Sequence, residues 1–69
     1  MHGVEVITAT EKKYGFDNSE LRGAETYAFK VTRSGALIIK RCIVTSADVL
    51  FVSVAAFADG EWSRVGPLR

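Results

Sequence analysis

The chain has 69 residues, a formal net charge of +1 and 48% hydrophobic residues. These values indicate one small folded domain (residues 1–69), and they exclude a disordered chain or one drawn to nucleic acid by its overall charge. The single cysteine excludes an internal disulfide, and the one histidine, His2, leaves no Cys/His cluster for zinc. We therefore expect neither a metal nor a cofactor.

No signal peptide is recognisable, and the longest apolar stretch, Val49–Ala58, is too short to span a bilayer. We expect a cytoplasmic protein that does not contact a membrane. A chain of this size usually needs disulfides, a metal or partner subunits for firm stability, so we expect self-association to supply what the small core lacks.

The first predicted strand runs from Val4 to Glu11, where apolar residues alternate and Val, Ile and Thr are frequent. Residues 14–23 are predicted to form a loop, because they contain two glycines together with Asp, Asn and Ser. Within this loop, Asn18 or Ser19 can cap one helical turn that ends at Gly23.

The second and third predicted strands, Glu25–Thr32 and Ala36–Thr45, form a hairpin. The three residues between them end in Gly35, which fits a type I turn followed by a glycine bulge. The register that this turn imposes pairs Val31 with Leu37 and Phe29 with Ile39.

The fourth predicted strand spans Ser46–Ala58 and is apolar on both of its faces from Val49 onward. The Asp59-Gly60 pair that follows is typical of a type I′ hairpin turn. Such a hairpin places Trp62, on a fifth strand, opposite Phe57. We interpret Trp62 as a packing residue, with a ligand-stacking platform as the alternative.

A buried helix over Ser46–Ala58, capped by Thr45 or Ser46 and ended by Gly60, is an alternative to the fourth strand. Half of the residues from Val49 to Ala58 are β-branched or aromatic, which favours the strand. The predicted fold class is all-β, a small antiparallel sheet, sandwich or barrel of about five strands. Because both faces of Val49–Ala58 need cover, we expect neighbouring subunits to complete it as a homo-oligomer.

Catalytic constellations are missing from the sequence, and we do not expect an enzyme. A general acid–base site normally uses a histidine or a pair of carboxylates in a cleft, whereas the acids here stand in loops, at turns or on alternating strand faces. Cys42 alternates with Lys40 and Val44 and is expected to act as a small buried hydrophobe, because no histidine is placed to activate its thiol.

A group of basic residues surrounds the predicted hairpin: Lys30, Arg33, Lys40 and Arg41. With Tyr27 and Phe29 nearby, this group could contact phosphates while the aromatic rings stack on bases. Strand alternation, however, places these aromatic residues and Lys30 on opposite faces. A solvated edge that discourages strand-to-strand aggregation is therefore the alternative interpretation.

Four short segments, in order, resemble the tryptophan RNA-binding attenuation protein family. They are Val6–Glu11, Arg22–Thr26, Gly35–Ile39 and Thr45–Ala47. The resemblance implies an all-β subunit whose strands continue a sheet into the next subunit. It also implies that the subunits close into a ring and bind tryptophan between them. A head-to-tail interface that closes is a ring, which would cover Val49–Ala58.

The resemblance carries some ligand positions but not the RNA contacts. Thr26 and Ser46 match loop positions that contact the amino acid in the family, and Gly23 matches the loop glycine that lets the backbone approach it. The threonine that opens the family's loop motif is Leu21 here. A lysine and an arginine that contact RNA in the family correspond to Val49 and Phe51, which cannot contact phosphate.

Two functions follow as hypotheses. The first is a non-enzymatic oligomeric binding module that binds a small, amino-acid-like ligand at subunit boundaries, between the loops Gly15–Gly23 and Thr45–Asp48; its ligand-binding candidates are Gly23, Thr26, Thr45 and Ser46. The alternative is a small SH3-like or OB-like β-barrel that binds nucleic acid through Lys30, Arg33, Lys40 and Arg41, or binds a protein partner.

Overall fold

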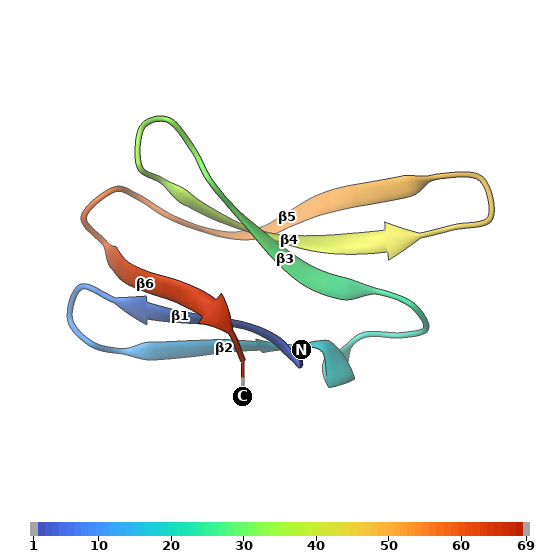
Figure 1. Cartoon of the computed structure of the whole chain (residues 1–69), viewed down its shortest axis with the longest axis horizontal. Helices are drawn as coiled ribbons and strands as arrows, with labels where there is room; N and C mark the ends of the chain where they lie inside the picture. The colour runs from blue at the N-terminus through green and yellow to red at the C-terminus, as the bar shows by residue number, and fades with distance from the viewer. Residues whose placement is uncertain (1, 69) are drawn as a thin grey trace.

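The computed structural model describes residues 2–68, which form two small antiparallel sheets. The elements are β1 (Gly3–Thr8), β2 (Lys13–Asp17), the 3-10 helix η1 (Asn18–Glu20), β3 (Thr26–Val31), β4 (Leu37–Val44), β5 (Val49–Phe57) and β6 (Trp62–Pro67). The first sheet has the strand order β2-β1-β6, and the second has the order β3-β4-β5 (Figure 1). The all-β prediction is confirmed. The two sheets pack as an open sandwich, and the barrel is not formed. Within residues 2–68, no helix has the length and apolar character needed to cross a membrane.

The core lies between the central strands of the two sheets. Val4 and Val6 of β1 face Leu37 and Ile39 of β4, and all four side chains are fully buried. Six partly buried residues pack around them: Phe16, Tyr27, Ala55, Phe57, Trp62 and Val65. A strand at the centre of a sheet is flanked on both sides, which explains why β1 and β4 supply the buried residues.

The second sheet extends beyond this core. Leu37 and Ile39 are buried, but Arg41 and Ile43, which follow on the same face of β4, are only half-buried. Figure 1 shows the ends of β4 and β5 reaching to the right, past the edge of the first sheet. We call this part of the second sheet, residues 41–52, the overhang.

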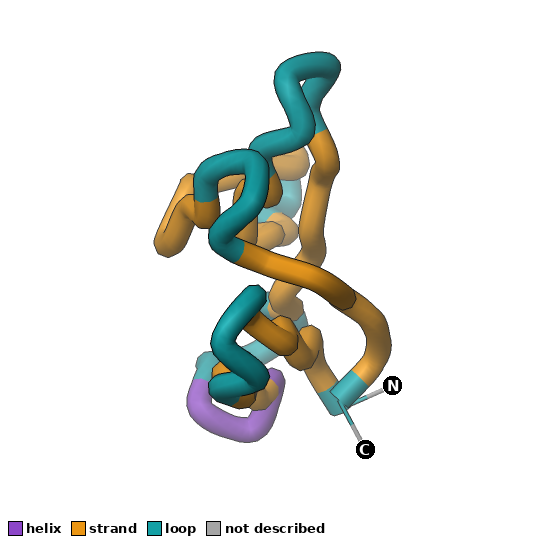
Figure 2. Tube along the Cα trace, turned by 90° about the vertical axis from the view of Figure 1, so that its left-hand side faces the viewer, coloured by secondary structure: helices purple, strands orange, loops and turns teal. Residues whose placement is uncertain are grey.

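The opposite end of the sandwich is tied together by three turns, which Figure 2 shows one above another facing the viewer. The Ala9 N–H donates to the Glu61 carbonyl at 3.0 Å, which links the β1–β2 turn to the β5–β6 turn. The Trp62 indole N–H donates to the Gly35 carbonyl at 2.9 Å and so holds the β3–β4 turn against β6. The β4–β5 turn, at the end of the overhang, forms no backbone hydrogen bond to another turn within residues 2–68.

The register of the β3–β4 hairpin agrees with the sequence. Val31 pairs with Leu37 and Phe29 with Ile39. The Gly35 N–H donates to the Thr32 carbonyl at 3.0 Å, and Gly35 has a φ of 86°, as a type I turn with a glycine bulge requires.

β2 occupies residues 14–17 of the segment that the sequence predicted to be a loop, so the prediction is wrong for these residues, whereas residues 21–23 lie in a loop. Its hairpin with β1 turns at Thr8–Lys12, where the Thr8 hydroxyl accepts the Lys12 N–H at 3.0 Å and Glu11 has a φ of 64°. Glu11 thus takes a left-handed conformation that normally favours glycine. Because glutamate is not a turn signal, the sequence does not indicate a turn there. The predicted helical turn is present as η1, but its cap is Asp17 instead of Asn18 or Ser19.

The fourth predicted strand is confirmed as β5, and the helix alternative is wrong. The hairpin predicted after it is also wrong, because β6 pairs with β1 in the other sheet. The Glu61 N–H donates to the Ala58 carbonyl at 2.9 Å, and Gly60 has a φ of 86° while Asp59 does not have a positive φ. A type I′ turn needs positive φ at both central residues, so the chain instead makes a turn of type II character and crosses between sheets. Trp62 pairs with Thr8 and not with Phe57.

Candidate functional site

The most exposed apolar surface lies on β5, an edge strand of nine residues that contains no charge, proline or glycine. None of its residues is buried. Five large apolar side chains in it are between 43% and 59% exposed: Val49, Leu50, Phe51, Val52 and Val54. Monomeric proteins rarely expose contiguous apolar patches above a few hundred Å², and a long apolar edge strand invites pairing with another chain.

Both faces of β5 contribute to this surface. Leu50 and Val52 pair with Ile43 and Arg41, so they lie on the face of the sheet that carries the core. Val49, Phe51 and Ser53 lie on the outer face, and the register shift beside Lys40 leaves Val54 as an extra residue between the two pairing segments. The first sheet ends before the overhang, so it does not cover Leu50 and Val52, which are 49% and 43% exposed.

The structure brings together two of the four basic residues proposed for nucleic acid. Lys30 and Lys40 share the outer face, since Lys40 pairs with Ala28 and Lys30 with Ile38. The Lys40 Nζ lies 5.8 Å from the centre of the Phe51 ring, which is 59% exposed. Phe51 was not among the aromatic residues considered from the sequence, although continuing the register from β4 to β5 places it on the lysine face.

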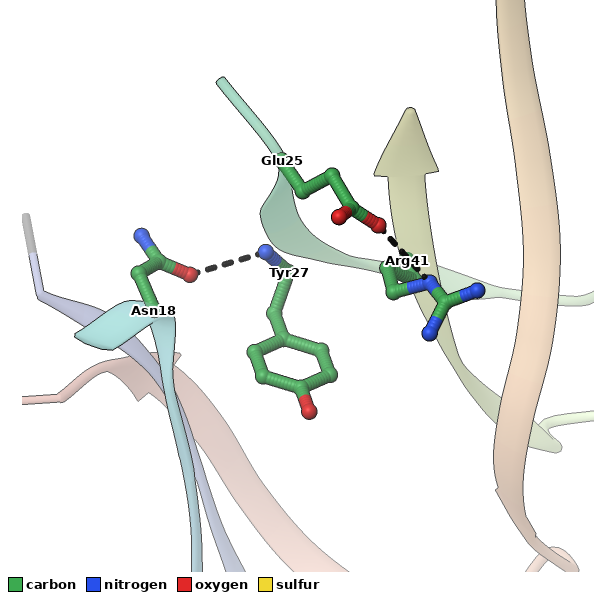
Figure 3. A network of polar contacts seen from close by, with 4 residues as sticks. All are labelled: Asn18, Glu25, Tyr27 and Arg41. Carbon is green, nitrogen blue, oxygen red and sulfur yellow. Dashed lines mark hydrogen bonds and ion pairs between the residues drawn. The ribbon is translucent and has the colours of Figure 1, made fainter. Parts of the chain in front are cut away.

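The other two basic residues lie elsewhere. Arg33 is in the β3–β4 turn at the tied end. Arg41 is on the core-bearing face, where its Nε lies 3.1 Å from Glu25 Oε1 (Figure 3). The Arg41 Nε–H is not aligned on that oxygen as a hydrogen bond requires, so this contact is an ion pair.

The four predicted ligand residues lie at one end of the second sheet, in two groups. Gly23 is in the loop before β3 and has a φ of 63°, and Thr26 begins β3 opposite Cys42. Thr45 and Ser46 lie in the β4–β5 turn. At about 3.3 Å per residue, the three steps from Cys42 to Thr45 separate the groups by roughly 10 Å along the strands, so one chain does not form a single site from them.

The Thr45 hydroxyl is already used within the β4–β5 turn. Its oxygen accepts the N–H groups of Ala47 and Asp48 at 3.3 and 2.9 Å, and it donates to the Asp48 carbonyl at 3.0 Å. Ser46 is exposed beside it. Thr45 therefore shapes the turn that presents Ser46, and its contact with a ligand stays a prediction.

A polar network fixes the loop that carries Gly23. Asn18 Oδ1 accepts the Tyr27 N–H at 2.8 Å and so joins η1 to β3 (Figure 3). One residue earlier, Asp17 Oδ1 accepts the Ser19 N–H at 2.9 Å, and this backbone hydrogen bond lowers the pKa of Asp17. Asp17 thus caps η1, and Asn18 ties the start of η1 to the start of β3 across the loop that carries Gly23.

Two shallow depressions lie on the surface away from the candidate ligand-binding and nucleic-acid-binding residues. One, of about 440 Å³, contains the Lys13–Glu5 ion pair, with Nζ and Oε1 3.4 Å apart. The other, of about 430 Å³, contains Tyr14 against Phe57, with ring centres 5.7 Å apart. Among residues 2–68, no group of three or more His, Cys, Asp or Glu side chains is arranged to hold a metal ion. Cys42 is half-buried.

Comparison of the chain with protein-family models, with curated proteins and with solved structures found no match.

Proposed function

We propose that this protein is a non-enzymatic binding module that works as an oligomer, with further copies of the chain covering β5. The observation that carries the proposal is the exposure of β5 on both faces and along its free edge. At about 25 cal/mol per Å², burying a few hundred Å² of this strand contributes several kcal/mol, which is comparable with the whole stability of a small domain.

Oligomerisation would also bring together the candidate ligand residues, which one chain holds apart. Thr45 and Ser46 lie at one end of β5, apart from Gly23 and Thr26 of the same chain. A second copy seated beside β5 can bring its own loop, residues 15–23, to the β4–β5 turn of the first. A small amino-acid-like ligand would then bind at the boundary between copies, as the resemblance to the attenuation protein family implies.

The test is native mass spectrometry of the purified protein, with and without tryptophan. We expect a closed assembly with one ligand per subunit. An assembly that ignores tryptophan, and whose melting temperature is unchanged by a panel of amino acids, would remove the ligand but keep the oligomer. A monomer at every concentration would overturn the proposal.

A second candidate function is binding of single-stranded nucleic acid on the outer face of the second sheet. The observation that favours it is the exposed Phe51 ring with the Lys40 ammonium beside it and Lys30 on the same face. Stacking of a base on an aromatic side chain contributes about 1–3 kcal/mol, and lysines supply phosphate contacts. We expect Phe51→Ala to weaken binding to single-stranded RNA at low salt by about tenfold or more. Phe29→Ala, on the opposite face, is the control, and no binding at low salt would exclude this function.

A further inference from the structure

The amides on the free edge of β5 can be assigned from the register. Thr45 N–H donates to the Asp48 carbonyl at 2.8 Å, so these residues form a hydrogen-bonded pair. Such pairs alternate with non-bonded pairs in an antiparallel ladder, and the extra residue Val54 shifts the alternation by one. The amides that face away from β4 are consequently those of Val49, Phe51, Ser53, Ala56 and Ala58.

The first and last of these amides are already occupied by carboxylates of the same chain. Val49 N–H donates to Asp48 Oδ1 at 2.8 Å, and Ala58 N–H donates to Glu61 Oε1 at 2.8 Å. A carboxylate in this place removes the donor and also sets a negative charge where the carbonyl of an added strand would lie. The open part of the edge is therefore bounded on both sides.

We propose that Asp48 and Glu61 are the stops of this edge, and that a second copy of the chain pairs its backbone with β5 between them. The pairing uses the amides of Phe51, Ser53 and Ala56. This inference rests on the proposed self-association and adds the segment of the β5 edge that pairs, with its two limits.

The two stops restrict a pairing that the side chains of β5 specify only weakly. A strand apolar on both faces specifies register weakly, because a slip by one residue exchanges one apolar face for another. Fixed ends confine the pairing to one segment of β5 without placing a charge inside the interface. The free edge of β3 uses the same device at one position, where Asn18 Oδ1 accepts the Tyr27 N–H, and β6 ends in Pro67, which has no N–H to offer.

Amide-resolved hydrogen exchange, measured at concentrations above and below assembly, tests the location. We expect protection of the Phe51, Ser53 and Ala56 amides to rise by about tenfold or more on assembly. The Val49 and Ala58 amides should keep the same protection in both states, since their acceptors lie within the chain. Assembly without added protection at the three open amides would overturn edge pairing but leave self-association intact. Failure to assemble at any concentration would instead overturn the self-association on which it rests.

A pair of double variants tests the stops. Asp48→Ala with Glu61→Ala removes both acceptors, and we expect native mass spectra with a broad distribution of sizes in place of one stoichiometry. Asp48→Asn with Glu61→Gln keeps both acceptor oxygens and removes only the charges, and it should retain the single stoichiometry. If the alanine pair shows the same stoichiometry and the same protected amides as the parent protein, the two carboxylates do not limit the pairing.

Discussion

At the scale of single residues, Glu11 holds a backbone conformation that suits glycine. It is the one non-glycine residue within residues 2–68 with a positive φ, 64°. Gly35 occupies the corresponding place in the β3–β4 turn, with a φ of 86°. The two turns also share a threonine whose hydroxyl accepts the N–H four residues later, at 3.0 Å for Thr8 and 3.1 Å for Thr32. For a residue with a Cβ, the left-handed conformation costs roughly 1–2 kcal/mol.

Replacing Glu11 by glycine and Gly35 by alanine should change the stability of the protein in opposite directions. We expect Glu11→Gly to raise the free energy of unfolding, by up to about 1 kcal/mol once the entropy of glycine in the unfolded chain is included. Gly35→Ala should lower it by more than 1 kcal/mol, as its Cβ would lie 2.8 Å from the Asp59 Cγ. Gly23→Ala is the control for the conformation alone, because nothing lies within 4 Å of its Cβ position. Urea unfolding measures all three, and a loss of stability in Glu11→Gly would contradict the argument.

This comparison also explains what the sequence could show of the turns. Gly35 is a visible turn signal, so the β3–β4 turn and its register were predictable. Glu11 gives no such signal, so the β1–β2 turn was not predicted, and neither was the strand β2 that follows it. The shared pattern of Thr8-x-Thr10 and Thr32-x-Ser34 was the available sign, since in both turns the two hydroxyls lie within hydrogen-bond distance of each other, at 3.2 and 2.9 Å.

At the scale of elements, β5 was predictable as a strand, but its partners were not. Asp59-Gly60 correctly marks a reversal of the chain. A turn signal does not say, however, whether the returning strand pairs with the preceding one or with a strand of the other sheet. Here Trp62 packs on the core and bonds to Gly35, and this places β6 beside β1. Tertiary packing thus decides the pairing, and the sequence around the turn does not contain that information.

The exposed valines of two edge strands, β5 and β3, allow a direct test of whether copies of the protein assemble through β5. We expect Val52→Asp to give a folded monomer, since the added carboxylate would have to be buried without a partner in the interface. Val31→Asp is the matched control, because Val31 is 47% exposed and Val52 43%, and Val31 lies on the edge of β3. Sedimentation gives the size and circular dichroism the fold. An unchanged oligomer for Val52→Asp would contradict assembly through β5.

At the scale of the whole molecule, the boundary between the core and the overhang divides β4 into a part that holds buried side chains and a part that holds none. Ile39 is fully buried between the sheets, whereas Ile43, on the same face, is half-buried where the first sheet no longer reaches. Periodicity predicts that both residues lie on one face. It does not predict how far the other sheet extends, and so the separation of the candidate ligand residues into two groups was also not predictable.

Shortening each isoleucine should separate folding from assembly. Ile39→Ala is expected to lower the free energy of unfolding by about 2–5 kcal/mol, as a buried side chain is replaced by a cavity. Ile43→Ala should cost the monomer under about 1 kcal/mol and weaken the proposed oligomer instead, because in that proposal another copy would complete the surroundings of Ile43. Unfolding of dilute protein and dissociation on dilution measure the two effects. Equal losses of monomer stability would show that the overhang is part of the core.

The two ends of the described chain lie side by side in the first sheet, where β1 and β6 are neighbours. The Leu68 N–H donates to the Gly3 carbonyl at 3.0 Å, and Figure 1 shows both ends on the side of the molecule away from β5. A short linker could therefore join them, and the chain could be reopened in a surface turn as a circular permutant. A fluorophore or affinity tag at either end would likewise stand clear of the strand through which copies are proposed to meet.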